Sequence, residues 1–198
     1  SHQDSICLIG SCFSNHIFDQ LFTHGFNVFK NPCGIVYHPI SVLNSLRFAE
    51  NPSQIENITL HSQKQKFFSL DHHGDFSANH SEIVLENIRS KAIAAHYFLK
   101  QSNYVILTFA TAHVFYFEGQ AVANCHQMAA NQFERNMLTP AELKQIMQEI
   151  VDCIKRINPN IKIIVTLSPV RYLADGFQNT LSKSRLIEAM LSQSEFEY

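Results

Sequence analysis

Four short runs rich in Val, Ile and Phe recur along the chain, and they constrain its fold more than any other feature. They are Ile6–Ile9, Phe26–Phe29, Tyr104–Phe109 and Ile161–Leu167. Apolar runs of this length are typical of strands that are buried on both faces of a sheet. Helical patterns separate most of the runs, and strands that alternate with helices indicate a parallel sheet. The sequence therefore predicts a three-layer α/β sandwich with helices on both faces of a mainly parallel sheet.

The helices between these runs are predicted from apolar spacing and from end signals. After the first run, apolar side chains at helical spacing predict a helix that stops near Gly25. The clearest helix start is Thr139, because Pro140 and Glu142 follow it in the pattern of a capping box. Further helices are expected over about 81–100, 140–158 and 182–192.

Length and charge limit the class of protein. With 198 residues the chain is expected to form a single domain over residues 1–198. Its formal net charge is −2 and its Lys and Arg residues are scattered, which argues against a nucleic-acid partner. No apolar run is long enough to span a bilayer. The missing initiator Met and the ending at Tyr198 lead us to expect a domain truncated at both ends.

The cysteines indicate a reducing compartment. There are 5, an odd number, and no pair has the Cys-x-x-Cys spacing of a metal site. This usage fits a cytoplasmic protein better than a secreted disulfide framework. The sequence indicates no cofactor, and it leaves the oligomeric state open.

The loops that follow the predicted strands are the expected place for a site. In parallel α/β sheets, ligands bind beyond the carboxyl ends of the strands, where the strand order reverses. The relevant loops are Gly10–Ser14, Lys30–Pro39, Ala110–His126 and Ser168–Thr180.

The first of these loops places Cys12 at the start of a predicted helix. Free backbone N–H groups and the helix dipole there favour a thiolate, and the same groups can hold an oxyanion. A second interpretation is that Ser11 or Ser14 caps the helix and Cys12 packs as a small apolar residue. Both interpretations remain open on the residues alone.

Six segments of the chain together resemble the GSCFA-domain family, a branch of the SGNH/GDSL hydrolase superfamily. The leading one is Gly10-Ser11-Cys12-Phe13-Ser14, with Ser14 where the family usually has Ala. The others follow in the family's order over almost the whole chain, at 31–39, 71–77, 107–112, 122–126 and 168–176. The resemblance implies a flavodoxin-like fold of SGNH type, and truncation would leave its sheet without the last strand.

The resemblance also implies roles for particular residues. The superfamily motif is Gly-Asp-Ser, so placing Gly10 on its Gly puts Cys12 on the nucleophile, while a shift of one residue would select Ser11. The oxyanion donors would be the nucleophile's N–H and Gly34 on the second loop. The third loop carries Thr111 but no Asn at the matching place. Asn124 from the same excursion could supply the amide, or it could stabilise a turn.

The base is the weakest part of the implied site. Superfamily members take a His from a late Asp-x-x-His motif, which this chain does not contain, and Tyr172 stands where the family often has another His. By loop position the candidates are His72, His73 and His126. Structural roles are expected for the histidines at predicted helical positions, His16, His24 and His96.

Two further patterns concern a metal site and a substrate anion. Cys125 and His126 could join His72 and His73 around zinc, but adjacent pairs do not easily point at one ion, so no metal is predicted. Arg171 could bind a substrate carboxylate or phosphate, or it could hold the Asp175-Gly176 turn.

The sequence thus predicts acyl-group chemistry: an ester or thioester hydrolase or acyltransferase with a Cys or Ser nucleophile. Its substrate would be a small-molecule or carrier-linked acyl compound. The alternatives are a catalytically inactive module that binds an acylated ligand or a partner protein, and a redox-sensing thiol at Cys12.

Overall fold

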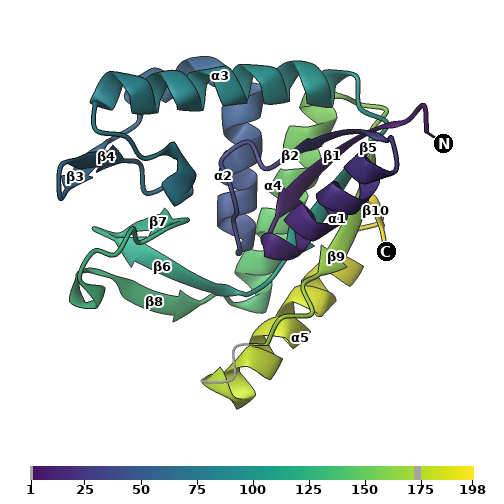
Figure 1. The fold of residues 1–198 in the computed structure, drawn as a ribbon. Coiled ribbons are helices and arrows are strands. Elements are labelled where there is room, and N and C mark those ends of the chain that lie inside the picture. The colour runs from purple at the N-terminus through teal and green to yellow at the C-terminus, as the bar shows by residue number, and fades with distance from the viewer. Residues whose placement is uncertain (1, 172–174) are drawn as a thin grey trace.

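The centre of the molecule is a five-stranded sheet whose neighbouring strands are all parallel. The computed structural model describes residues 2–171 and 175–198. The strands are β1 (Ser5–Gly10), β2 (Asn27–Lys30), β5 (Tyr104–Phe109), β9 (Lys162–Leu167) and β10 (Phe196–Glu197). Their order is β10-β9-β5-β1-β2, so the chain first steps to one side of β1 and then to the other (Figure 1). The carboxyl ends of β1 and β5 flank the point where the order reverses.

The predicted strands agree closely with this sheet. The bounds of β5 are the predicted ones, those of β9 differ by one residue at its start, and those of β1 and β2 differ by one residue at each end. The structure adds a fifth strand that the sequence did not predict, because Phe196 and Glu197 pair with Ile163 and Ile164.

Five α-helices surround the sheet, and the structure adds one that the sequence analysis did not predict. They are α1 (Cys12–Thr23), α2 (Pro39–Glu50), α3 (Ser81–Lys100), α4 (Pro140–Ile157) and α5 (Phe177–Leu191). Helix α1 packs on β1 and β2, whereas α2 contacts both α3 and α4, and α4 contacts α5 (Figure 1). None of the helices in the part of the chain that the structure describes is both long and apolar enough to cross a membrane.

Helix boundaries follow the predicted end signals at most places. In α4 the Thr139 hydroxyl accepts the Glu142 N–H at 3.3 Å, and the Thr139 N–H donates to the Glu142 carboxylate at 2.7 Å. This confirms the capping box. Helix α5 begins at Phe177, earlier than predicted. His24 is not inside a helix but follows the last residue of α1, where its ring contacts the Gln20 carbonyl.

A flank of antiparallel strands lies beside the parallel sheet, on the left of Figure 1. The predicted loop 110–126 is partly wrong, because it contains a hairpin that turns at Glu118 and Gly119. The strands of this flank are β3 (His61–Gln63), β4 (Lys66–Phe68), β6 (His113–Phe117), β7 (Gln120–Val122) and β8 (Glu134–Met137). Short 3-10 helices also occur at η1 (Pro52–Asn57), η2 (Gly74–Phe76) and η3 (Ala130–Gln132).

Candidate functional site

The carboxyl ends of β1 and β5 approach so closely that only glycine fits at position 10. Gly10 has a φ of +145°, and a Cβ there would lie 2.3 Å from the Thr108 carbonyl oxygen. The Gly10 N–H donates to the Asn31 side chain at 2.8 Å, and the Ser11 N–H donates to the Thr108 carbonyl at 3.2 Å. These contacts fix the path of the chain into α1.

Helix α1 begins without a side-chain cap. Ser11 occupies the N-cap position, but its hydroxyl makes no capping hydrogen bond and is fully buried without a partner. The N–H groups of Cys12 and Phe13 likewise have no protein partner among the described residues. Cys12, by contrast with Ser11, is half-buried, and its thiol is free. A partly accessible thiol therefore lies beside two unused N–H donors at a helix N-terminus.

Tyr37, on the second loop, lies within electrostatic range of this thiol. Burial raises the pKa of the Tyr37 phenol, and the negative charge of a Cys12 thiolate raises it further. The Tyr37 carbonyl accepts the N–H groups of Ala110 and Thr111 at 2.9 and 3.3 Å. Tyr37 thus ties the second loop to the third, and its phenol responds to charge at Cys12.

Gly34 lies on the second loop, as predicted, but its N–H is engaged. It donates to the Asn31 carbonyl at 2.9 Å, whereas the next N–H, of Ile35, has no protein partner in the described part of the chain. Gly34 has a φ of +78°, and a Cβ there would lie 2.2 Å from the His73 Cβ. Because the Val36 N–H donates to the Gly10 carbonyl at 3.1 Å, this loop runs alongside the start of α1.

A cavity of about 430 Å³ opens beside Tyr37. We call it the apolar pocket, since Phe115, Val122 and Ala123 form much of its wall. It is also lined by Tyr37, His38, Thr111, His113, Asn124, Cys125 and Arg135. The structure thus brings Thr111 and Asn124, two of the predicted binding residues, to one cavity, which Tyr37 also lines.

His113 is the histidine of this pocket with a free ring nitrogen. Its Nδ1 contacts the Thr111 hydroxyl at 3.3 Å, and its Nε2 has no protein partner among the described residues. Burial and then the charge of Arg135 lower the pKa of His113, while Asp175 opposes them. The other pocket histidine, His38, uses both nitrogens: Nε2 donates to the Val122 carbonyl at 3.0 Å and Nδ1 accepts the Ser41 N–H at 3.1 Å.

His72 lies inside the molecule, away from solvent. Its ring packs against Phe48 and Phe76, and its Nδ1 contacts the Ser69 hydroxyl at 3.0 Å. Its Nε2 is buried without a partner, and burial lowers the pKa of the ring to about 3. The ring is therefore neutral at physiological pH.

His126 and His73 likewise take up local contacts. The His126 Nε2 donates to the carbonyls of Ser69 and His72 at 2.8 and 2.9 Å. The His73 Nδ1 lies 3.1 Å from the Asp75 carboxylate. No hydrogen bond joins any of the three predicted histidines to Cys12 or Ser11 in the described structure.

The remaining predicted residues have distinct surroundings. The Asn124 side chain accepts the His126 N–H at 2.9 Å, so it stabilises a turn while also lining the apolar pocket. Arg171 is exposed, and the ion-pair partner of Asp175 is Arg135 rather than Arg171. The prediction for Tyr172 falls outside the described residues. Within those residues, no group of three or more His, Cys, Asp or Glu side chains is arranged to hold a metal ion.

Sequence reasoning gave no role to two residues that the structure brings to this place, Tyr37 and His113. Each lies close in sequence to a residue with a predicted role, since Tyr37 follows Gly34 and His113 follows Thr111. Their position close behind the ends of strands is the signal that could have found them.

Fold and site together define a doubly wound α/β protein with a free thiol at the reversal point of its sheet. The model of the GSCFA family matches residues 5–196. The chain therefore belongs to the GSCFA family. No curated protein and no solved structure gives a significant match to it.

Proposed function

We propose that this protein transfers or hydrolyses acyl groups through the thiol of Cys12. The observation that carries the proposal is the position of this thiol, half-buried at the uncapped start of α1 beside two free N–H groups. The proposed relation to SGNH hydrolases places the nucleophile at the same point. Ser11, the alternative, has no exposed surface through which a substrate could reach it.

The proposed reaction has two balanced steps. The Cys12 thiolate attacks the carbonyl carbon of an ester or thioester, forms a C–S bond and generates a tetrahedral oxyanion. Collapse of this intermediate expels the alcohol or thiol, which takes up a proton. Water, or an acceptor hydroxyl or amine, then attacks the new thioester, the C–S bond breaks and the thiolate is restored. A thioester intermediate favours acceptors that are better nucleophiles than water, which supports the acyltransferase form.

The proposed oxyanion donors lie on two segments. The N–H of Cys12 is the first, since it has no other partner. The second loop supplies the other through Gly34, whose N–H would have to leave the Asn31 carbonyl, or through Ile35, whose N–H is free. Such donors act by stabilising charge that develops only in the transition state. The acyl group itself would lie in the apolar pocket beside Tyr37.

We propose His113 as the base among the described residues. Its Nε2 is free, it lines the pocket that reaches Tyr37, and the Tyr37 phenol lies near the thiol. The Thr111 hydroxyl would orient its ring. His72 and His126 are less suitable because their rings are held by the loop around Ser69.

The nucleophile is tested by mass spectrometry after incubation with an activated acyl ester. We expect one acyl adduct on the wild type and on Ser11→Ala, and none on Cys12→Ala. An adduct that survives Cys12→Ala but disappears in Ser11→Ala would overturn the assignment. His113→Asn should slow adduct formation by about 100-fold or more, the usual contribution of a general base.

A second function is favoured by one observation: no histidine is hydrogen-bonded to Cys12 in the described structure. A catalytically inactive module could use the same pocket to bind an acylated ligand. Such a module would bind a non-hydrolysable acyl analogue but would form no adduct and turn over no p-nitrophenyl or thioester substrate. These two measurements separate the two functions.

A further inference from the structure

A second cavity lies on the other side of the second loop from the apolar pocket. It has a volume of about 280 Å³, and we call it the lysine pocket. Gly34 and Ile35 line it, whereas Tyr37 and His38 of the same loop line the apolar pocket. Its polar lining consists of Lys30, Lys91, Asn15, Asn31, Asn87 and Asp75.

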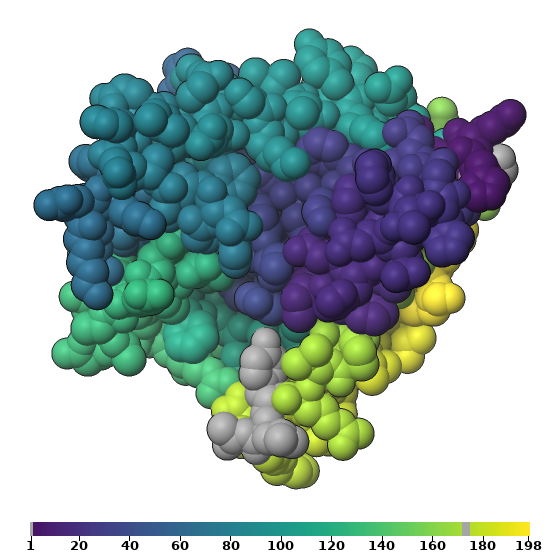
Figure 2. Space-filling view, viewed as in Figure 1, coloured from purple at the N-terminus to yellow at the C-terminus, as the bar shows by residue number. Residues whose placement is uncertain are grey.

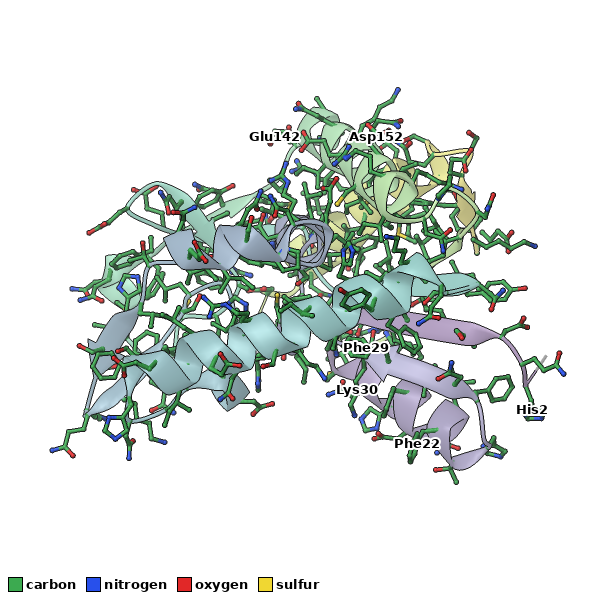
Figure 3. The ribbon with its side chains drawn as sticks, turned by 90° about the horizontal axis from the view of Figure 1, so that it is seen from above. His2, Phe22, Phe29, Lys30, Glu142 and Asp152 are labelled. Carbon is green, nitrogen blue, oxygen red and sulfur yellow. The ribbon has the colours of Figure 1, made fainter. Side chains whose placement is uncertain are left out.

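The two lysines give the pocket its charge. Lys91, on α3, is half-buried, and its ammonium lies 4.6 Å from the centre of the Phe29 ring without any ion pair among the described residues. Burial and then the neighbouring Lys30 lower the pKa of Lys91, so the two ammonium groups lie close enough to repel. Figure 3, which looks down onto α3, shows Phe29 and Lys30 next to each other at the end of β2, beside this helix.

The amides of the pocket are arranged as donors. The buried Asn31 side chain accepts the Gly10 N–H, and its NH₂ group donates to the side-chain oxygen (Oδ1) of Asn15 at 2.8 Å. The oxygen of Asn15 is thus occupied, and its NH₂ group has no protein partner in the described part of the chain. Asn15 is one helical turn after Cys12, so both side chains lie on the same face of α1.

Countercharges around the two lysines are few. Lys30 lies 3.2 Å from the Asp19 carboxylate, outside the pocket lining. Asp75, the one carboxylate in the lining, is exposed and pairs with His73 at 3.1 Å. The half-buried Lys91 and the Asn15 amide are therefore left as donors without an acceptor, which favours an anionic ligand.

We propose that the lysine pocket binds the phosphate of an acyl donor whose alcohol or thiol arm carries a phosphate group. The inference rests on the proposed function. Cys12 itself lines neither cavity, but Asn15, one turn further along α1, lines the lysine pocket, and Tyr37, whose phenol is within electrostatic range of Cys12, lines the apolar pocket. The acyl chain would lie in the apolar pocket and the phosphate in the lysine pocket, with the scissile carbonyl at Cys12.

The size of the lysine pocket agrees with the binding of only the phosphate end of such a ligand. Pockets that enclose a whole small molecule have about 300–1,000 Å³, so 280 Å³ suits one group of a longer ligand. In the space-filling view the purple surface that includes α1 borders the teal surface that includes α3 (Figure 2). Both helices contribute to the lysine pocket, α1 through Asn15 and α3 through Lys91.

The test compares two ligands that differ only in the phosphate, 4′-phosphopantetheine and pantetheine. Calorimetry on the full chain with Cys12→Ala removes covalent chemistry from the measurement. We expect 4′-phosphopantetheine to bind at least tenfold more tightly than pantetheine. Lys91→Met should abolish this difference and Lys30→Met should reduce it. The exposed Lys144→Met on α4 is the matched control and should leave it unchanged.

Equal affinity for the two ligands, or a phosphate preference that persists in folded Lys91→Met, would overturn the proposal. A carrier protein that bears the phosphopantetheine arm serves as a second ligand. Tighter binding of the carrier than of the free arm identifies a carrier-linked donor, and equal binding identifies a small-molecule donor. The nucleophile is judged separately by the adduct on wild-type protein, so a failure of Cys12 chemistry and a failure of the lysine pocket give different results.

Discussion

The parallel sheet and the antiparallel flank are held together by different means. The sheet and its helices enclose one large apolar core, in which Leu107, Met147 and Ile150 are fully buried. The flank, residues 58–80 and 113–137, encloses only a small cluster of its own, around Phe68 and Val122, and otherwise adds residues such as Val114 to the edges of cores that the helices build. Five of the six described non-glycine residues with positive φ belong to it: Lys64, Gln65, Glu118, His126 and Gln127. Hydrogen bonds from the rings of His126 and His38 to backbone carbonyls add to the strand pairing of the flank.

Because of this difference, the two halves of the candidate site lie in regions of unequal rigidity. One region is the parallel sheet with its helices, which we call the rigid layer, and the other is the flank. Cys12 lies at the end of a central strand of the rigid layer. Most of the apolar pocket comes from the flank, which is joined to that layer by contacts such as the His38–Val122 hydrogen bond at 3.0 Å. Local opening is easiest where few apolar contacts are made. The nucleophile is thus fixed, while the pocket wall has more freedom to adapt to an acyl group.

The largest expected effect comes from adding a methyl group to the rigid layer. Gly10→Ala should destabilise the protein by about 4 kcal/mol or more, since the new Cβ would meet the Thr108 backbone and neither strand can move. In the flank, Gly119→Ala meets open space at a φ of +78°. Only the left-handed backbone then costs energy, about 1–2 kcal/mol.

Urea unfolding of both variants measures the difference. If Gly119→Ala costs as much as Gly10→Ala, the flank is as tightly constrained as the parallel sheet, and the contrast between the two regions fails.

The same contrast separates what the sequence could predict from what it could not. Strand β5 and helix α3 were predicted to the residue because their patterns depend on the core alone. Helix α2 was missed because its N-cap is His38, whose ring is held by Ser41 and by a carbonyl from a distant strand. No local pattern contains that second contact.

The candidate site divides in the same way. Cys12 and Gly34 follow from local sequence and from the family motif, and the structure places both at the reversal point of the sheet. The pairing of Tyr37 with Cys12, and the lysine pair across β2 and α3, depend on which segments the fold brings together. The hairpin of β6 and β7 was predicted as a loop, although its Glu118-Gly119 turn was a usable signal.

A smaller effect is expected from the buried histidine of the flank. The pKa of His72 is lowered to about 3, so the unfolded chain binds a proton at this site below pH 6.5 that the folded chain does not. Stability should therefore fall as the pH drops from 6.5 towards 3. At pH 5 the loss from this one group is about 2 kcal/mol. His72→Phe should remove that part of the pH dependence while keeping the packing against Phe48 and Phe76.

Unfolding curves at pH 7 and pH 5 test this expectation. Phe76→Leu is the matched control, because it alters the packing but keeps the imidazole, and it should retain the wild-type pH dependence. Identical pH dependence in the wild type and in His72→Phe would show that the ring is not held neutral by burial.

The smallest expected effects come from comparing the N-termini of two helices in the rigid layer. Thr139→Ala removes the hydroxyl that accepts the Glu142 N–H and contacts the Glu142 carboxylate, and it should cost about 1 kcal/mol. Ser11→Ala at the start of α1 removes a hydroxyl that caps nothing and has no partner. It should change stability by no more than about 0.5 kcal/mol, since loss of an unsatisfied buried polar group offsets the small cavity that is left.

Denaturant midpoints measure the loss in free energy of unfolding for Thr139→Ala and Ser11→Ala on one scale, provided that the m-values are unchanged. A loss in Ser11→Ala as large as that in Thr139→Ala would mean that the Ser11 hydroxyl does cap α1. The N–H groups beside Cys12 would then be partly occupied, and the proposed oxyanion site would lose its main support. A negligible loss leaves these groups free for a ligand, because the helix that carries the candidate nucleophile is stabilised by its packing on β1 and β2 instead of by a cap.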